Sequence, residues 1–283
     1  MNRRDLTFIG FTLIEMVVAI LLLGILGAGV AAFIVRPIEG YRDLARRAAL
    51  TDAAESALRR LERDIRAALP NSVRVTNLGG GGFAVETLPI LDGAFYRDRN
   101  NAAGTTTVFN RLNAGGNDTD FDIHKFFQHV AVPSSSTTHR LVVDNAGAAV
   151  IQDNVYTASG NQAVITPPGT VITYTATGLS SGGAAAHHVN MNPQHRFRGD
   201  SPRQRIYIVE TPVTYLCTPN AANPVLGTLM RYAGYNISSV QPTDPNAAPL
   251  ATAASARGAD RISACTFNTS TVDIRNRATA TLT

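Results

Sequence analysis

The first part of the chain is one long apolar run. Residues 11–35 carry a single charged side chain, Glu15. As a helix, this run would be roughly 38 Å long, enough to cross a bilayer with some tilt. Arg3 and Arg4 precede it, and positive charge at this position favours a cytoplasmic N-terminus. The pattern therefore predicts one membrane-spanning helix, with the bulk of the chain exported.

A second helix, amphipathic and charged, is predicted to continue the first over residues 36–69. Its apolar residues recur at spacings of three and four, which places them on one face. We expect this stripe to pack on the domain that follows. Its members are Ile38, Tyr41, Ala45, Ala48, Leu58, Leu61, Ile65 and Leu69.

Two residues near the junction of these segments weaken the helix. Pro37 lacks a backbone N–H, and Gly40 lowers helicity in the next turn. We expect a kink at Pro37 and Gly40. Pro70 is expected to end the helical run.

Residues 70–283 have the sequence pattern of an antiparallel β-rich domain. Short runs rich in Val, Ile, Thr and Tyr alternate with clusters of Gly, Ser, Asn and Pro. The expected fold class is α+β, with a long N-terminal helix packed on this domain. Expected strands are residues 72–76, 83–88, 140–143, 171–176, 205–210, 213–217, 227–232, 263–267 and 279–282. Expected loops are residues 79–82, 114–120, 134–138, 180–186 and 241–256.

Composition narrows the function classes. Of the 283 residues, 45% are apolar and 16% charged, which excludes a wholly disordered chain. The net charge is +4, and the cations, all arginine except Lys125, are dispersed. A nucleic-acid binder clusters its cations, so no nucleic-acid partner is expected.

Glu15 is the unusual residue of the apolar run. A carboxylate in hydrocarbon costs several kcal/mol, and such residues usually mark function. An ordinary secretory signal, cleaved after small residues such as Val30 and Ala32, has no use for it. Neither has a plain membrane anchor. A charge tolerated near the membrane interface is the structural alternative.

Residues 10–15 read GFTLIE, after a short basic leader and before the apolar run. This string resembles the processing site of type IV prepilins. The resemblance implies that residues 1–10 are a leader, which a membrane-embedded prepilin peptidase cuts between Gly10 and Phe11. It also implies N-methylation of Phe11 by the same enzyme. Glu15 would then neutralise the N-terminal amine of a neighbouring subunit, as an assembly residue and not a catalytic one.

The exported part adds a second resemblance. Residues 196–209 and 212–217, with shorter blocks at 36–41 and 69–75, resemble MshO-type minor pilins of the MSHA pilus, a type IV pilus. The resemblance implies a location in the bacterial inner membrane and then in the pilus. It implies other pilins, the inner-membrane assembly platform and the lipid bilayer as partners. It also implies another strand or two after residue 283, so the chain is either a short member or truncated.

Cys217 and Cys265 are the two cysteines. In an exported chain an even, sparse count permits one disulfide, which would close a loop of about 48 residues. We expect that bridge; two buried free thiols are the alternative, and a zinc site is not expected.

No enzyme, metal or cofactor site is expected. His187, His188 and His195, with Asp200 nearby, fit no ligand spacing and are assigned to a loop. The acidic segment of Asn117, Asp118, Asp120 and Asp122 lacks the EF-hand pattern. The glycines at 79–82 lack the Lys-Ser/Thr of a phosphate loop.

Two other functions remain open. A minor pseudopilin of a type II secretion system shares the leader and the helix–sheet plan. A membrane-anchored adhesin at a pilus tip is the alternative from another class. Ligand binding that depends on Arg196, Arg198, Arg203 and Arg205 would favour it.

Overall fold

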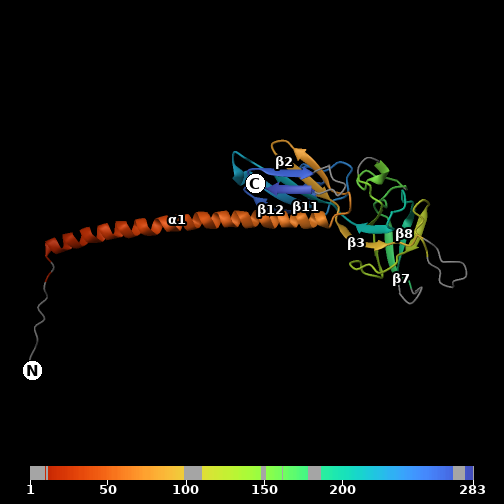
Figure 1. Ribbon diagram of the computed structural model, residues 1–283, viewed down its shortest axis with the longest axis horizontal. Helices are drawn as coiled ribbons and strands as arrows, with labels where there is room; N and C mark the ends of the chain where they lie inside the picture. The colour runs from red at the N-terminus through yellow and green to blue at the C-terminus, as the bar shows by residue number, and fades with distance from the viewer. Residues whose placement is uncertain are drawn as a thin grey trace, which may run out of the picture. The chain divides into compact units, whose positions relative to one another are not determined.

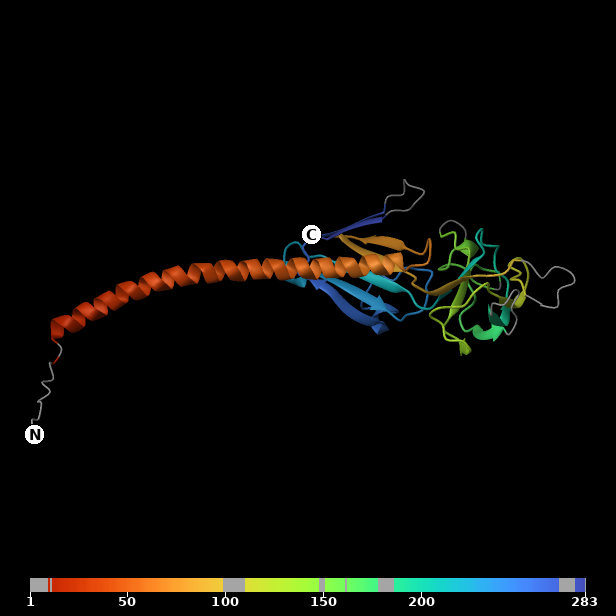
Figure 2. The same cartoon turned by 60° about the horizontal axis from the view of Figure 1, so that its bottom comes forward.

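A computed structural model describes residues 10, 12–98, 110–147, 151–160, 162–177, 186–269 and 278–282. The chain divides into two units, Met1–Ala53 and Ala54–Thr283. Figures 1 and 2 show the elements in two views. These are α1 (Leu13–Arg66), β1 (Arg74–Leu78), β2 (Gly82–Thr87), β3 (Ile90–Phe95), β4 (Asp118–Asp122), β5 (Ser134–Ser136), β6 (Arg140–Val143), β7 (Val171–Thr177), β8 (Ala186–His195), β9 (Arg205–Val209), β10 (Val213–Thr218), β11 (Thr228–Ala233), β12 (Ala254–Asp260), β13 (Cys265–Thr269) and β14 (Ala278–Leu282), with short 3-10 turns at Ile151–Asp153, Pro224–Leu226 and Leu250–Thr252.

Helix α1 begins at Leu13 and runs without interruption through Pro37 and Gly40. A continuous helix can still bend, so the expected kink at Pro37 and Gly40 stays a prediction. The helix ends at Arg66, not at residue 69. Leu69 donates its N–H to the carbonyl of Leu88 (2.8 Å), and Ala68 forms a bridge with Pro89. Pairing with the segment after β2 replaces the last helical turn.

The apolar stripe of the amphipathic helix divides into two parts with different environments. Ile38, Tyr41, Ala45 and Ala48 are exposed. They lie in the unit Met1–Ala53, so the expectation that they pack on the domain stays a prediction. The later members of the stripe are buried or half-buried: Leu58, Leu61, Ile65 and Leu69.

The last turns of α1 cover one face of a five-stranded antiparallel sheet, with strand order β1-β2-β10-β11-β12. Figure 1 shows β11 and β12 beside this part of the helix. Ala57 and Leu61 pack with Phe83, Tyr215 and Leu229 in one core cluster. On the other face, Tyr235 and Leu250 from the β11–β12 connection cover β10. Strand β10 is therefore buried on both faces.

A second β region is inserted between β2 and β10. It contains a three-stranded sheet, β3-β9-β6, and a four-stranded sheet, β4-β8-β7-β5, each antiparallel. Side chains from both sheets form one core, with Phe121, Tyr174, Val189, Ile206 and Ile208 among its buried members. In Figures 1 and 2 these strands group apart from the sheet of β2, β11 and β12.

All nine expected strands lie on observed strands, within two residues at most ends. Several expected loops are strands instead. The segment 114–120 contains the start of β4, 134–138 contains β5, and 241–256 ends in a 3-10 turn and the start of β12. The histidine segment, expected to be a loop, is β8. These strands are short or polar, and β5 is only Ser-Ser-Ser. Their side-chain pattern does not predict a strand. They become strands because they pair with neighbouring strands in the sheet.

Candidate functional site

The apolar part of α1 is uncovered. Residues Leu13–Ala31 form a 19-residue stretch with a mean hydropathy of 2.5, and none of it is buried within the chain. Leu21, near its middle, is 58% exposed. By length and composition this helix could span a membrane or serve as a signal sequence near the N-terminus.

Thr12 caps the start of this helix. Its carbonyl accepts the N–H of Met16 (3.2 Å), and its Oγ1 accepts the N–H of Glu15 (3.4 Å). Thr12 and Glu15 thus have the Thr-x-x-Glu spacing of a capping box. Glu15 is exposed and lies in the first turn, where the helix dipole favours a negative charge. This spacing is a sequence signal for the start of a helix near Thr12.

Gly10 is exposed and lies outside the helix. A Cβ at this position would meet no atom within 4 Å, so the described chain gives no steric reason for glycine here. Phe11, the expected first residue of the mature chain, lies outside the described residues.

Glycines inside the apolar helix have open surroundings. A Cβ at Gly24, Gly27 or Gly29 would also meet nothing within 4 Å. These positions leave the helix backbone open to close approach by another helix, which small residues favour in membranes.

The packed end of α1 is held in register by Asp64. Its Oδ2 accepts hydrogen bonds from the Tyr215 hydroxyl (2.7 Å) and from Nε of Arg231 (2.8 Å). Burial and the Asp64 carboxylate raise the pKa of Tyr215. This contact joins the helix to β10 and β11, which are about 150 residues further along the chain. No local sequence pattern could have indicated it.

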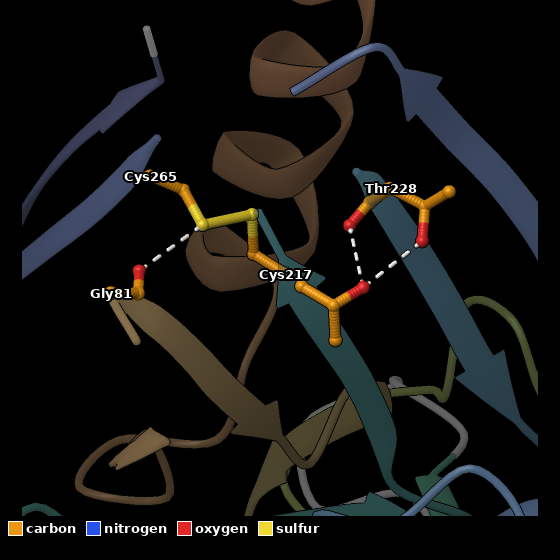
Figure 3. The surroundings of a disulfide bond; sticks show 5 residues. Gly81, Cys217, Thr228 and Cys265 are labelled. Atoms are coloured by element: carbon orange, nitrogen blue, oxygen red, sulfur yellow. Dashed lines mark hydrogen bonds between the residues drawn. A yellow bond between two sulfur atoms is a disulfide. The ribbon is translucent and has the colours of Figure 1, made fainter. Parts of the chain in front are cut away.

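The expected disulfide is confirmed. Cys217, in β10, is bonded to Cys265, the first residue of β13, with Cα atoms 6.7 Å apart. Figure 3 shows the bridge in front of α1, with Sγ of Cys265 directed to the carbonyl of Gly81 (3.5 Å). Both cysteines belong to the core cluster that α1 covers. The bridge therefore attaches the β13–β14 hairpin to the sheet.

The histidines of β8 form internal hydrogen bonds. Nδ1 of His188 lies 2.8 Å from Asp122, and its Nε2 lies 3.3 Å from Asp120. The hydrogen bond to Asp122 raises the pKa of His188. His187 accepts the N–H of Phe127 through Nδ1 (3.0 Å). A search of the described ranges found no group of three or more His, Cys, Asp or Glu residues that could hold a metal ion.

Comparisons of the chain with protein-family models, with curated proteins and with solved structures gave no match. A functional assignment therefore depends on the residues and the geometry described above.

The candidate site residues lie in two separate places. Gly10, Glu15, Pro37 and Gly40 are all exposed positions at or on the N-terminal part of α1. The cysteines lie under its packed end. The first group offers a surface for other molecules, and the second stabilises the β-rich unit.

Proposed function

We propose that the chain is a minor pilin-like structural subunit of a type IV pilus of the MSHA type, and not an enzyme. It is cut after Gly10, methylated at Phe11 and held first in the membrane and then in the filament by its N-terminal helix. The observation that carries this proposal is an apolar helix that the chain leaves wholly uncovered, headed by GFTLIE and its one carboxylate.

The energetics of Glu15 support assembly over a plain anchor. An acid in the first turn of a helix gains about 0.3–1 kcal/mol from the helix dipole. A carboxylate in the centre of a bilayer costs about 2.5–3.5 kcal/mol on insertion scales. Capping by itself therefore offsets only part of this cost wherever Glu15 enters hydrocarbon. The new N-terminal amine of an adjacent mature subunit supplies the missing counter-charge.

The exposed apolar surface extends beyond the membrane span. Tyr41 is 74% exposed, and Ile38 and Leu44 are exposed on the same helix. A signal sequence or a simple anchor needs no apolar residues after the span. In a filament, neighbouring helices bury them.

The glycine at position 10 fits recognition by a peptidase. Because no neighbour within the described chain limits its size, the requirement lies in the peptidase, which must approach the backbone closely. Gly10→Val should leave the leader uncut. A normal mature mass for that variant would contradict the processing step.

The experiment that tests assembly is Glu15→Val, expressed at native level in cells of the source organism. Leader removal and membrane insertion should be unchanged, while the amount of the subunit in sheared filaments should fall at least tenfold. Glu39→Val is the matched control, because Glu39 is an exposed acid of the same helix beyond the span. Normal incorporation of the Glu15 variant would refute charge pairing. Loss of protein secretion without any change in filaments would assign the chain to a type II secretion system.

A further inference from the structure

A cleft of about 280 Å³ opens in the β-rich unit. Three segments line it: residues 69–71 after α1, residues 144–145 after β6, and residues within 201–207, from the loop before β9 and the start of that strand. The volume is close to the lower end of the range for small-molecule sites. None of the residues assigned to assembly lines this cleft.

One wall of the cleft is fixed by a reciprocal pair of hydrogen bonds. Nδ2 of Asn71 donates to the carbonyl of Asn145 (2.9 Å), and Nδ2 of Asn145 donates to the carbonyl of Pro70 (2.8 Å). Asn71 and Asp144 have positive φ angles of 60° and 55°. Asn and Asp tolerate this conformation better than most residues. The wall is therefore a defined turn whose side chains border the cleft.

The segment that carries Ser201 and Arg203 is held by a buried tyrosine, Tyr96. The hydroxyl of Tyr96 accepts the N–H of Ser201 (2.8 Å), and the N–H of Tyr96 donates to the carbonyl of Gln204 (2.9 Å). Burial raises the pKa of Tyr96 to about 12, so its hydroxyl stays protonated at neutral pH. Gln204 has a φ of 53°. These contacts preorganise the loop that carries Arg203 and leads to Arg205, the first residue of β9.

Four polar side chains of the cleft are free to bind a ligand. Arg203 and Arg205 are exposed, and neither forms an ion pair with the described residues. The guanidinium of Arg205 lies over the ring of Phe95, 5.4 Å from its centroid. The Asp144 carboxylate and the Ser201 hydroxyl also have no hydrogen-bond partner within the described ranges.

Tyr207 adds an aromatic surface. Its ring lies over Gly93, where a Cβ would be 3.2 Å from Cδ1 of the ring. A larger residue at position 93 would therefore crowd the tyrosine ring. Tyr207 is only half-buried and lines the cleft.

From this arrangement we infer that the cleft binds a small carboxylate-bearing, hydroxylated ligand, of the class of acidic mono- and disaccharides. The guanidinium groups of Arg203 and Arg205 are suited to a carboxylate. The Asp144 carboxylate accepts hydrogen bonds from ligand hydroxyl groups, the Ser201 hydroxyl both donates and accepts them, and the Tyr207 ring offers an apolar face. This inference does not depend on assembly into a pilus.

The test is calorimetric titration of the full chain in detergent micelles with digalacturonic acid, neutral digalactose and a short single-stranded oligonucleotide. The acidic disaccharide should bind at least tenfold more tightly than the neutral one. The double variant R203A/R205A should weaken its binding at least tenfold. The matched control is R60A/R111A, which removes the same charge from two exposed arginines outside the cleft.

Tyr96→Phe provides an independent readout. It removes the hydrogen bond between the Tyr96 hydroxyl and Ser201 without removing a side chain that lines the cleft. It should weaken binding several-fold while thermal unfolding stays cooperative. The inference fails if digalacturonic acid does not bind at about 10 mM, or if the control variant loses affinity as much as R203A/R205A. It also fails if the oligonucleotide binds more tightly than the acidic sugar.

Discussion

The two ends of α1 use the same kind of side chain for opposite purposes. At the N-terminal end, none of Leu13–Ala31 is buried within the chain. At the C-terminal end, Leu61 is 1% exposed and packs on the sheet. Apolar periodicity predicts a helix in both places, but it does not say what covers the apolar face. An uncovered apolar surface requires a cover from outside the chain, and this requirement is the physical basis of the proposed membrane and filament roles.

The disulfide under the packed end should give the largest effect on stability. Cys217→Ser with Cys265→Ser opens a loop of 48 residues and should lower the free energy of unfolding by about 4 kcal/mol. Urea unfolding in detergent, followed by tyrosine fluorescence because the chain has no tryptophan, measures it. Each single variant should lower the free energy of unfolding as much as the double variant does. Unchanged stability in the double variant would show that the bridge does not contribute.

A pair of leucines tests the comparison itself. Leu61→Ala should destabilise the β-rich unit by about 2–5 kcal/mol, because it leaves a cavity against the sheet. Leu21→Ala is the matched change on the exposed end and should cost this unit less than about 0.5 kcal/mol. The same urea titration applies. Equal effects would remove the distinction between the two ends.

Asp64 sharpens the comparison on the polar side. Asp64→Ala leaves the Tyr215 hydroxyl and Arg231 without their shared acceptor and should cost about 1–3 kcal/mol. The control is Glu55→Ala, which breaks an exposed helical ion pair with Arg59 and should cost at most about 0.5 kcal/mol. If both variants lower the free energy of unfolding equally, Asp64 contributes no more to stability than an exposed charge does.

The smallest effect should come from His188, in strand β8. Asp122 and Asp120 raise its pKa in the folded state. The stabilisation is therefore complete below the pKa of the unfolded chain, about 6.5, and is lost as pH rises through the folded-state pKa. The stability difference between wild type and His188→Gln should be larger at about pH 5.5 than at about pH 8.5. A stability difference that grows with pH would contradict the assigned interaction between His188 and the two aspartates. Membrane insertion should be unaffected at either pH.

The sequence was sufficient for elements whose own side chains carry the pattern. The membrane-length helix and strands such as β10, rich in Val, Tyr and Leu, were predicted. Strands β4 and β12 were not predicted, and the expected loops 114–120 and 241–256 cover the first three residues of each. Asp-Thr-Asp-Phe-Asp and the Ala- and Gly-containing β12 have little apolar alternation. Their positions depend on partners far along the chain.

The functional residues divide in the same way. Gly10 and Glu15 belong to a contiguous motif, and the cysteine pair follows from a count of two in an exported chain. The Asp64 contact and the cleft were not predicted, although Arg203 and Arg205 were named among the residues on which ligand binding by an adhesin would depend. Each is formed by segments that only the folded sheet brings together.

The most direct test of the central claim is N-terminal sequencing and intact-mass measurement of the chain isolated from membranes of the source organism. Cleavage at the GFTLIE motif predicts a mature chain that begins with N-methylated Phe11 and retains Glu15 four residues later. A chain that still begins with Met1, or one cut beyond Glu15, would contradict it.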